Sequence, residues 1–537
     1  MDFGSVQYCY RAAVIPPFRI MKAALIFLVV LMVALSEART AQSSGSVLTR
    51  EDFPSYFVFG AGTSAYQVEG AVDEDGRSPS IWDVATHSGR ALFKDNGDVA
   101  ADHYHKYKED VKLMADIGLE AYRMSISWSR LLPDGRGLIN PQGLEYYNNL
   151  INELIDHGIE PHVTLYHLDH PQVLEEEYGG WLSPKMVEDF TEFADICFRE
   201  FGDRVSYWTT INEPNVFALG AYDSGVLAPQ RCSQPFGFNC IEGNSTVEPY
   251  IVVHHNMLAH ASVAALYREK YLAKQQGRIG LNVYAVWVSP LSNSTADALA
   301  AQRTIDFYNG WILSPLVFGD YPESMKKYVG PRLPSFTEFQ SKLIKGSFDY
   351  IGLNHYLTFF AQDNSDGQKP QVRDFNMDIS AKFALRQEDT PSGQVFPFKF
   401  PKAPWGLQSL LEDIKKTYGN PPVFIEENGY GQINDETLND TVRVDYLTAY
   451  LNATLNAIRN GSNTRGYFLW SFLDVFELLA GYHQRYGLYH VDFADENLKR
   501  TPKYSAHWFT DFLKRNKQQA KIEKKVMRLE TVSTVVE

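Results

Sequence analysis

Cysteine is scarce in this chain, with four residues among 537: Cys9, Cys197, Cys232 and Cys240. Two cysteines without a second pair nearby do not make a zinc site, so no structural zinc is expected. In an oxidising compartment, Cys232 and Cys240 are expected to form a disulfide across a short loop rich in Pro, Phe, Gly and Asn. Cys197 lies on the apolar face of a predicted helix, which indicates a buried thiol.

Long apolar runs are also missing, apart from one between Ala23 and Leu35 that is short for a membrane span. This run follows Met21-Lys22 and is followed by small and polar residues, which is the order of a secretory signal peptide. We therefore expect residues 1–41 to be a leader whose true start is Met21. Residues 42–537 would then form the mature domain with a short C-terminal tail, and this domain would have no membrane segment.

Positive charge is limited as well, because 50 Lys and Arg stand against 65 Asp and Glu, which gives a net charge of −15. This balance argues against a nucleic acid or an anionic membrane as partner. No internal repeat, low-complexity block or linker divides residues 45–515, so one domain is expected. Five glycosylation sequons agree with passage through the secretory route; they lie at Asn244, Asn293, Asn439, Asn452 and Asn460.

Helical and strand-like patterns alternate along this domain. Segments 103–117, 141–157 and 184–201 have helical periodicity, and each is followed by a strand-like run. Eight strands are predicted in all, near residues 57–62, 119–127, 159–166, 205–212, 278–285, 348–354, 422–427 and 464–471. Eight strands alternating with helices over this length predict an α/β fold, a single (β/α)8 barrel. The longer connections at about 214–250, 310–345 and 358–405 are expected to form active-site loops.

Polar side chains gather at the predicted C-terminal ends of these strands, where the chemistry of such barrels occurs. They are Arg123, His167, Asn212, Glu213, Asn354, Tyr356, Glu427 and Trp470. Two of them, Glu213 and Glu427, come from distant strands and can face one another across the barrel mouth. Cleavage of a glycosidic bond needs such a pair, with one carboxyl protonated to protonate the leaving oxygen and the other ionised to attack or to activate water.

Six motifs in a fixed order then carry a family resemblance: Phe57-Val-Phe-Gly-Ala-Gly-Thr-Ser-Ala-Tyr-Gln-Val-Glu-Gly70, Tyr122-Arg-Met-Ser-Ile-Ser-Trp-Ser-Arg130, Thr210-Ile-Asn-Glu-Pro214, Glu427-Asn-Gly429, Gly466-Tyr-Phe-Leu-Trp-Ser-Phe-Leu-Asp474, and the set Gly481-Tyr482, Tyr486-Gly-Leu488 and Val491-Asp492. On these motifs the sequence resembles glycoside hydrolase family 1, in the form of the retaining β-glucosidases of plants. The match extends from about residue 53 to residue 512.

The resemblance implies a role for several residues. Glu213 would be the acid/base and Glu427 the nucleophile, because the nucleophile of the family directly precedes Asn-Gly. Retention implies that the two carboxyls lie about 5–5.5 Å apart. Asn212 would bind the sugar 2-hydroxyl, while Arg123 and Tyr356 would keep the nucleophile ionised and oriented.

The resemblance also implies a pocket for the glucose unit. Gln67, His167 and Glu477 resemble groups that bind sugar hydroxyls, and Trp470 resembles the platform under the sugar ring. His167 and His170 lie near Asp169 in a sequence that could hold a metal. The motif match and the lack of a third ligand favour the sugar pocket instead, so neither a metal nor a cofactor is expected.

The chain departs from the family pattern at a few positions. Leu168 and Leu478 stand where many relatives have Trp, which affects how glucose is bound and which acceptor is used. Glu426 stands where relatives tend to have Thr or a small apolar residue. Since it directly precedes Glu427 in a predicted strand, Glu426 is expected to point to the other face of the strand and to be structural.

These features predict a secreted or vacuolar enzyme that removes a terminal β-glucosyl unit from a small-molecule β-glucoside. The main alternative keeps the same covalent intermediate but transfers glucose from an acyl-glucose to a flavonoid, anthocyanin or other phenolic acceptor. A non-catalytic carbohydrate-binding protein is a remote alternative, since both Glu213 and Glu427 are retained. A thioglucosidase is disfavoured because Glu213 keeps its carboxyl.

Overall fold

The computed structural model describes residues 48–90, 94–238, 240–365, 372–389, 401–433 and 438–514. By its internal contacts the chain divides into two units, residues 1–49 and 50–537, and the second contains all the helices and strands given below. The predicted leader with its signal peptide, Cys9 and the C-terminal tail beyond residue 514 lie outside the described residues.

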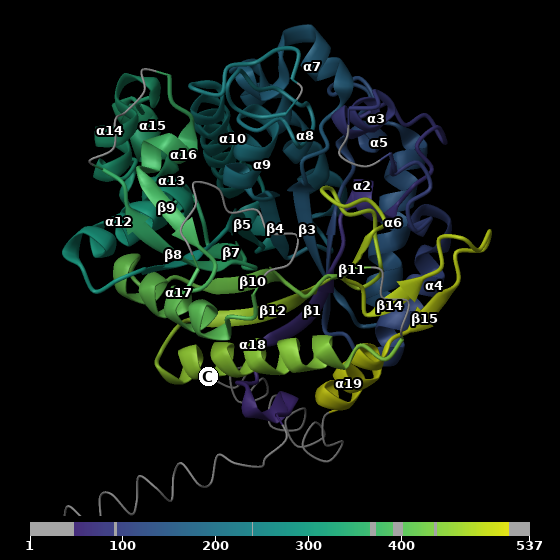
Figure 1. Cartoon of the computed structure of the whole chain (residues 1–537). Coiled ribbons are helices and arrows are strands. Elements are labelled where there is room, and N and C mark those ends of the chain that lie inside the picture. Colours follow the sequence, from purple (N-terminus) through teal and green to yellow (C-terminus); the bar gives the residue numbers. More distant parts are fainter. Residues whose placement is uncertain are drawn as a thin grey trace, which may run out of the picture. The chain divides into compact units, whose positions relative to one another are not determined.

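A closed barrel of eight parallel strands forms the centre of residues 50–537 (Figure 1). Around the barrel the strands follow the order β1, β12, β10, β7, β5, β4, β3 and β2. Their bounds are β1 Val58–Gly62, β2 Ala121–Ser125, β3 Glu160–Tyr166, β4 Tyr207–Ile211, β5 Arg278–Tyr284, β7 Tyr350–Asn354, β10 Val423–Asn428 and β12 Thr464–Trp470. All eight predicted strands are present, so the predicted (β/α)8 barrel is confirmed.

Helices surround the barrel, as Figure 1 shows. The longer ones are α4 His103–Ile117, α6 Pro141–Asp156, α8 Lys185–Phe201, α10 Glu248–Lys270, α12 Thr295–Ile305, α17 Pro404–Thr417, α18 Thr441–Arg459 and α19 Tyr504–Leu513. Local sequence explains their ends. Helix α4 ends where Gly118 adopts a left-handed φ of 82°, and α6 begins with Pro141 after the Asn140 side chain, which accepts a hydrogen bond from Gln142 N–H.

The long connections contain more regular structure than the sequence predicted. Residues 310–345 include the helices α13 Trp311–Phe318, α14 Glu323–Val329 and α15 Glu338–Ile344. Apolar residues in these helices, such as Trp311 and Leu316 in α13 and Met325 in α14, are buried, and this packing stabilises them. A further three-stranded sheet joins β6 Trp287–Pro290, β8 Thr358–Asp363 and β9 Ala381–Ala384, with α16 Phe375–Ile379 before the last strand.

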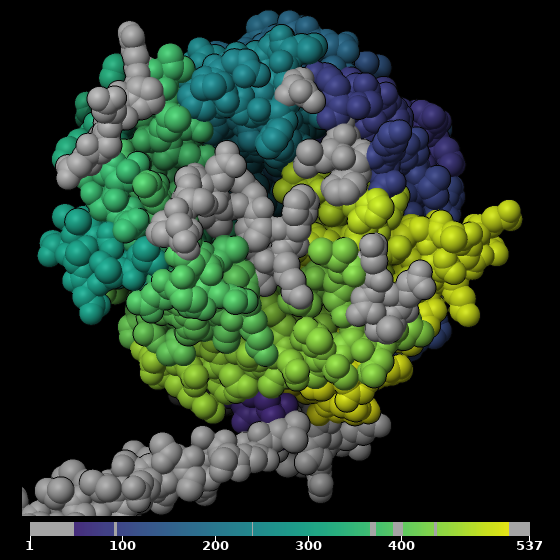
Figure 2. Space-filling view, in the orientation of Figure 1, coloured from purple at the N-terminus to yellow at the C-terminus, as the bar shows by residue number. Residues whose placement is uncertain are grey.

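Short elements complete the described residues: α2 Ala65–Val68, α3 Ile81–His87, α5 Trp128–Leu131, α7 Gln172–Tyr178, α9 Pro214–Tyr222, α11 Leu272–Gln275, β11 Gln432–Ile433, β13 Gln484–Arg485, β14 Tyr489–Val491 and β15 Arg500–Pro502. Several of these lie in connections that follow barrel strands. In the surface view of Figure 2, the C-terminal segments in yellow lie beside the green segments that precede them.

Aromatic side chains fill the N-terminal half of the barrel. A buried cluster joins Tyr350, Phe424 and Phe468, and His162 stacks on Tyr207 with ring centroids 4.3 Å apart. Glycines on the strands leave room for these rings, since a Cβ at Gly60 would lie 2.3 Å from the Phe468 ring. With this end filled by apolar side chains, the opposite end is left for polar ones.

Candidate active site

The predicted site residues lie together at the C-terminal end of the barrel. Most belong to strand ends or to the residues just after them: Arg123 in β2, His167 after β3, Asn212 and Glu213 after β4, Tyr356 after β7, Glu427 in β10 and Trp470 at the end of β12. Two come from the connections, Gln67 from α2 and Glu477 from the segment after β12. Hydrogen bonds and ring contacts join all of these residues except Gln67 into one network.

Glu213 occupies the sharp turn between β4 and α9. Its φ of 46° and ψ of 55° lie in the left-handed region, which is uncommon for residues other than glycine. Its backbone N–H donates to the carbonyl of Asn282 at 3.2 Å, and its carboxylate Oε1 accepts a hydrogen bond from Asn354 Nδ2 at 2.7 Å. A strained backbone of this kind costs about 1–3 kcal/mol and is found mainly at functional sites.

Glu427 is buried, with 5% of its surface exposed. Each of its carboxylate oxygens accepts a hydrogen bond from a different side chain. Arg123 Nη1 donates to Oε1 at 2.5 Å, and the Tyr356 hydroxyl donates to Oε2 at 3.0 Å. Donors on both oxygens stabilise the ionised form and fix its orientation.

Arg123 connects the two carboxyls. Besides Glu427, its guanidinium donates from Nη2 to Asn212 Oδ1 at 2.7 Å, and Asn212 Oδ1 also accepts from Asn354 Nδ2 at 3.2 Å. The same amide of Asn354 reaches Glu213. Glu213 and Glu427 therefore belong to a single hydrogen-bond network that runs through Arg123, Asn212 and Asn354.

The two carboxyls have different electrostatic surroundings. Loss of hydration raises the pKa of Glu213 to about 8, and the charge of Glu427 adds to this shift. Burial also raises the pKa of Glu427, but Arg123 and Tyr356 oppose that effect. A neutral amide donates to Glu213, whereas a cation and a phenol donate to Glu427. The last proton of the pair therefore stays on Glu213, which leaves one carboxylic acid and one carboxylate.

A second group of side chains borders this pair. The rings of His167 and Trp470 are nearly parallel, with centroids 5.9 Å apart, and Trp470 Nε1 donates to Glu477 Oε1 at 3.2 Å. Gln67 is tied to the same loop, since its Nε2 donates to the Phe476 carbonyl at 2.8 Å. Loss of hydration raises the pKa of Glu477 to about 8.

His167 presents an unused hydrogen-bond donor. Burial and the nearby Arg123 lower the pKa of His167 well below its usual value, so the ring is neutral. Its Nε2 accepts from Asn212 Nδ2 at 3.4 Å, which places the ring proton on Nδ1. That buried nitrogen has no partner among the described residues. A buried N–H without a partner is suited to binding a hydroxyl group of a ligand.

The expectation for Glu426 is wrong. It predicted that this side chain would point to the opposite face of the strand from Glu427, yet Glu426 also points into the barrel. Its Oε2 lies 3.3 Å from Arg123 Nε, and its Oε1 accepts from the Thr209 hydroxyl at 2.7 Å. The reason is an irregularity in β10, whose register shifts between Ile425 and Glu427. A bulge interrupts the alternation of side chains on which the expectation depended.

Two asparagines of the network received no role from the sequence. The sequence predicts a strand-end position but no function for Asn354, and it predicts no role for Asn282. The Asn282 amide Nδ2 donates to Asn354 Oδ1 at 2.7 Å and to Glu426 Oε2 at 2.8 Å. A signal was available, because Asn282 interrupts the apolar run of a strand that is buried on both faces.

Outside this network, the predicted disulfide is present between Cys232 and Cys240, and Cys197 is a buried free thiol as expected. The sequon residues Asn244, Asn293, Asn439, Asn452 and Asn460 are all exposed. Across the described ranges, no helix combines the length and apolar character needed to cross a bilayer. The same ranges contain no group of three His, Cys, Asp or Glu side chains placed to hold a metal ion.

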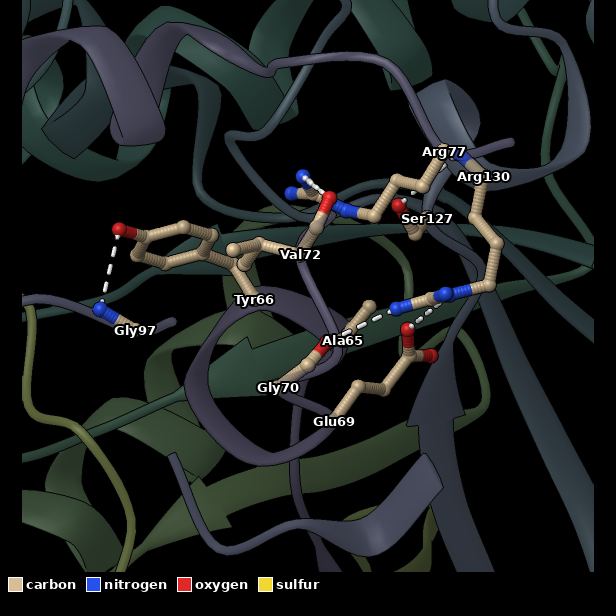
Figure 3. Close-up of a pocket in the computed structure, with 9 residues that line it drawn as sticks. All are labelled: Ala65, Tyr66, Glu69, Gly70, Val72, Arg77, Gly97, Ser127 and Arg130. Carbon is tan, nitrogen blue, oxygen red and sulfur yellow. Dashed lines mark hydrogen bonds and ion pairs between the residues drawn. The ribbon is translucent and has the colours of Figure 1, made fainter. Parts of the chain in front are cut away.

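A small pocket beside α2 is separate from the carboxyl pair (Figure 3). In it the guanidinium of Arg130 donates from Nε to Glu69 Oε2 at 2.9 Å and from Nη2 to the Gly70 carbonyl at 2.9 Å. The pocket encloses about 10 Å³, which is room for roughly one water molecule. It is too small for a sugar, so we do not assign it to the substrate.

A (β/α)8 barrel that brings an acidic carboxyl and an ionised carboxylate together at its strand ends has the architecture of a glycoside-cleaving enzyme. Comparison with known families agrees, because residues 49–518 match the family described as Glycosyl hydrolase family 1. The chain belongs to this family, as its motifs predicted.

Curated plant proteins are similar over most of their length. Beta-glucosidase 22 of Oryza sativa subsp. japonica is 61% identical over 480 residues, which cover 89% of this chain and 90% of that protein. An acyl-glucose-dependent cyanidin 3-O-glucoside 7-O-glucosyltransferase of Delphinium grandiflorum is 58% identical over 469 residues, covering 87% and 91%. Among solved structures, a mutant rice β-glucosidase in covalent complex with glucose has a TM-score of 0.85 at 44% identity, covering 87% of this chain and all of that one.

Proposed function

We propose that this enzyme is a retaining β-glucosidase that removes a terminal β-D-glucosyl unit from a small aglycone through a covalent intermediate. The observation that carries the proposal is the unequal surroundings of the two carboxyls. Glu427 accepts hydrogen bonds from Arg123 and Tyr356, while burial raises the pKa of Glu213 to about 8. A retaining glycosidase needs one ionised nucleophile and one protonated acid, and each carboxyl meets one of these needs.

In the first step, the carboxylate of Glu427 attacks the anomeric carbon while the bond from that carbon to the leaving oxygen breaks. Glu213 gives its proton to the leaving oxygen, so that the aglycone departs as a neutral alcohol or phenol. The products of this step are a glucosyl ester on Glu427 and an ionised Glu213. The charge on Glu213 suits the second step, in which it must act as a base.

In the second step, Glu213 takes a proton from water as the water oxygen attacks the anomeric carbon of the ester. The ester bond breaks, Glu427 recovers its charge, and β-glucose is released with Glu213 protonated again. Arg123 remains bonded to Glu427 and Asn212, and it therefore offsets the negative charge that returns to the nucleophile.

Binding of the glucose unit is assigned to the residues around the pair. The free Nδ1–H of His167 donates to a sugar hydroxyl, and Glu477, which is hydrogen-bonded by Trp470, accepts from other sugar hydroxyls. Gln67 binds beside them, and Trp470 supplies a ring surface for the apolar face of the sugar. Asn212, held between Arg123 and Asn354, binds the 2-hydroxyl, an interaction that strengthens in the transition state.

A second function is favoured by a specific similarity. The Delphinium enzyme, which transfers glucose from an acyl-glucose to an anthocyanin, is 58% identical to this chain. Transfer and hydrolysis share the glucosyl ester and differ in whether a phenol or water attacks it. Leu168 and Leu478 bear on that choice, since Leu supplies neither an N–H nor an aromatic wall to the sugar. We therefore keep acyl-glucose-dependent transfer to a flavonoid or phenol as the alternative.

We also propose that the protein follows the secretory route to the vacuole or the cell exterior. The exposed sequons and the disulfide between Cys232 and Cys240 support this route. So does the order of basic, apolar and small residues within 1–41, the segment predicted to be a signal peptide. Sequencing the N-terminus of the mature protein tests the leader, and a terminus that retains residues 23–35 would contradict it.

The catalytic assignment is tested with a 2-deoxy-2-fluoroglucoside that carries a good leaving group. The label should accumulate on Glu427, and fragmentation of the labelled peptide must separate it from Glu426. Glu427→Gly should turn over no substrate while keeping the melting temperature within a few degrees. Label on Glu426, or on neither residue, would remove the assignment.

Product analysis then separates the two functions. The enzyme is given an aryl glucoside or an acyl-glucose, each with and without a phenolic acceptor, and glucose and glucosylated acceptor are measured. Release of free glucose at an unchanged rate in all mixtures supports hydrolysis. Formation of the glucosylated phenol at the expense of glucose supports transfer. A protein that forms neither product but binds glucosides would be the carbohydrate-binding alternative.

A further inference from the structure

Glu426 is a third carboxyl next to the two that carry out the reaction. It is 1% exposed, and three hydrogen-bond donors lie beside its carboxyl. The Thr209 hydroxyl donates to Oε1 at 2.7 Å. Asn282 Nδ2 donates to Oε2 at 2.8 Å, and Arg123 Nε lies 3.3 Å from the same oxygen. Both carboxyl oxygens of Glu426 therefore have a hydrogen-bond donor beside them.

The fold provides space for this side chain. A Cβ on Gly352 of β7 would lie 2.7 Å from the Glu426 carboxyl, so only a glycine fits at that position without displacing it. The register shift in β10 turns the side chain into the barrel. Tyr350, on the same strand as Gly352, hydrogen-bonds the Thr209 hydroxyl at 2.9 Å and so orients it toward Glu426. Besides β10 itself, the strands β2, β4, β5 and β7 therefore contribute to holding one carboxyl that the two-carboxyl reaction does not use.

Two short connections lead from Glu426 to the catalytic pair. One passes through Arg123, which contacts Glu426 by Nε and Glu427 by Nη1. The other passes through Asn282, whose amide Nδ2 contacts both Glu426 and Asn354, and Asn354 donates to Glu213. Glu426 thus contacts the same arginine as the nucleophile Glu427. It also accepts a hydrogen bond from Asn282, the first of the two asparagines that lead to the acid Glu213.

We propose that Glu426 is a positioning residue whose charge sets the pH range in which Glu427 is ionised while Glu213 is still protonated. The proposal rests on the proposed function of that pair. It assigns Glu426 no contact with the substrate. Its influence acts through Arg123 on one side and through Asn282 and Asn354 on the other.

The charge count explains the direction of the effect. One guanidinium faces three carboxyls, and both Glu427 and Glu426 stabilise the charge of Arg123 against the cost of its burial. The other titratable groups that face this cluster are His167, Tyr284, Tyr350, Tyr356 and Glu477. An added negative charge makes ionisation of a neighbouring carboxyl less favourable. We expect a charge on Glu426 to act in this direction on Glu427, which shares Arg123 with it, and through the amides on Glu213.

The test compares variants that separate charge from shape. Glu426→Gln keeps the length of the side chain and removes the charge, Glu426→Asp keeps the charge and shortens the side chain, and Glu426→Thr removes both. Glu120→Gln is the control, because Glu120 is a carboxyl paired with an arginine, Arg50, at the opposite end of the barrel strands. For each variant, kcat/KM on an aryl β-glucoside is measured across pH, together with the melting temperature.

In Glu426→Gln and Glu426→Thr, both limbs of the pH profile should move to lower pH by roughly 0.5 to 1 unit, less than the ~1–3 units of an adjacent charge because Glu426 acts through Arg123 and the two asparagines. The acid limb moves because Glu427 ionises more readily, and the basic limb because Glu213 loses its proton more readily. Glu426→Asp and Glu120→Gln should keep the wild-type limbs, whatever their effect on kcat.

A fall in kcat without movement of the limbs, or movement to higher pH, would overturn the proposal. The proposal would also be overturned if Glu426→Asp folds but Glu426→Gln and Glu426→Thr do not. In that case the carboxylate would be needed for folding and not for setting the pH range. Infrared spectroscopy of the protonated carboxyl band, recorded across pH, measures where the carboxyls lose their protons in each variant without requiring turnover. If the proposed function is wrong, the wild-type enzyme will show no turnover and no fluoroglucoside label on Glu427. The shift of the infrared carboxyl titration between the wild type and the Glu426 variants would still decide the role of Glu426.

Discussion

The side-chain amide of Asn354 donates a hydrogen bond to Oε1 of Glu213 at 2.7 Å. The two residues are far apart in the sequence and lie at the ends of β7 and β4. This bond stabilises the ionised form of Glu213 and lowers its pKa, against the larger effect of burial that raises it. It also restrains a carboxyl whose own backbone lies in a strained region.

Asn354→Ala should therefore move the basic limb of the pH profile to higher pH, because Glu213 then holds its proton more tightly. The loosened acid should also lower kcat about 10- to 100-fold on substrates with poor leaving groups. The measurement is kcat/KM against pH on an alkyl β-glucoside. Asn309→Ala is a control, since Asn309 is equally buried but bonds the backbone of Val286. An unmoved basic limb would show that this bond does not act on the acid.

Removal of the acid itself should have an effect that depends on the leaving group. In Glu213→Ala, poor leaving groups should lose about 1,000-fold or more, whereas activated aryl glucosides should lose much less in the first step, because they depart without a proton. Added azide should restore turnover by attacking the glucosyl ester, and the product should be β-glucosyl azide. Nuclear magnetic resonance identifies the anomer. An α-azide, or equal losses for all leaving groups, is incompatible with retention through Glu213.

The sequence predicted the barrel and the catalytic pair for related reasons. Alternating apolar runs and Gly or Pro boundaries located the eight strands to within two residues, and polar residues at strand ends located Glu213 and Glu427. Parallel strands in a barrel bring such ends together. The motifs then gave roles to Arg123, Asn212 and Tyr356, and the structure places all three in one network with the pair.

The parts that the sequence missed depend on contacts between strands. The sequence predicts the wrong face for Glu426 because the bulge in β10 has no marker such as Gly in the run Val423–Asn428. It marks Asn282 only as a polar interruption of an apolar strand, because the role of this residue comes from neighbours on β7 and β10, which lie 72 and 144 residues away in sequence. Periodicity describes the faces of a regular strand, and it contains no information about register shifts or cross-strand amide chains.

The disulfide should stabilise its loop more than the barrel. Cys232 and Cys240 are eight positions apart, and closing a loop of this size stabilises the folded segment by about 2 kcal/mol. In the double variant Cys232→Ser with Cys240→Ser, limited proteolysis should cleave within residues 223–247 at least several times faster. Activity at low temperature should change little.

The matched comparison is Cys197→Ala, which removes a buried thiol that is not part of a disulfide. It should affect the melting temperature through packing while leaving cleavage of the loop at the wild-type rate. Non-reducing peptide mapping of the native protein should find Cys232 joined to Cys240. Recovery of both as free thiols would end this assignment.

The five sequons should differ in glycan occupancy. Asn244, Asn293 and Asn439 are exposed and lie outside helices. Asn452 lies within α18 and donates from Nδ2 to the Thr448 carbonyl at 2.8 Å, and Asn460 donates to Glu412 at 2.7 Å. Since a glycan is attached to this same nitrogen, we expect high occupancy at the first three sites and low occupancy at the last two. Mass spectrometry of peptides after enzymatic deglycosylation measures each site, and the reverse order would contradict the argument.

Leu168 and Leu478 directly follow His167 and Glu477, two of the residues assigned to the glucose unit. Leu168 is 2% exposed and follows His167 with a φ of 67°, and Leu478 follows Glu477. A Trp at these positions would add an indole N–H and a stiff aromatic wall, whereas Leu offers neither. Weaker binding of the glucose unit should make the rate depend more on the acceptor. We therefore expect slow hydrolysis of simple aryl glucosides and a clear gain in rate when a phenolic acceptor is supplied.

Restoring Trp at both positions should shift the partition of the glucosyl ester toward water by several-fold. Because Leu168 is buried, the larger ring also costs stability, about 1–3 kcal/mol, so Leu168→Phe with Leu478→Phe serves as a control that adds an aromatic ring without the N–H. The ratio of glucose to glucosylated phenol is measured for all three proteins below their melting temperatures. If the unmodified enzyme hydrolyses simple glucosides rapidly and ignores every acceptor, transfer is not its function, and the two leucines do not weaken its hold on glucose.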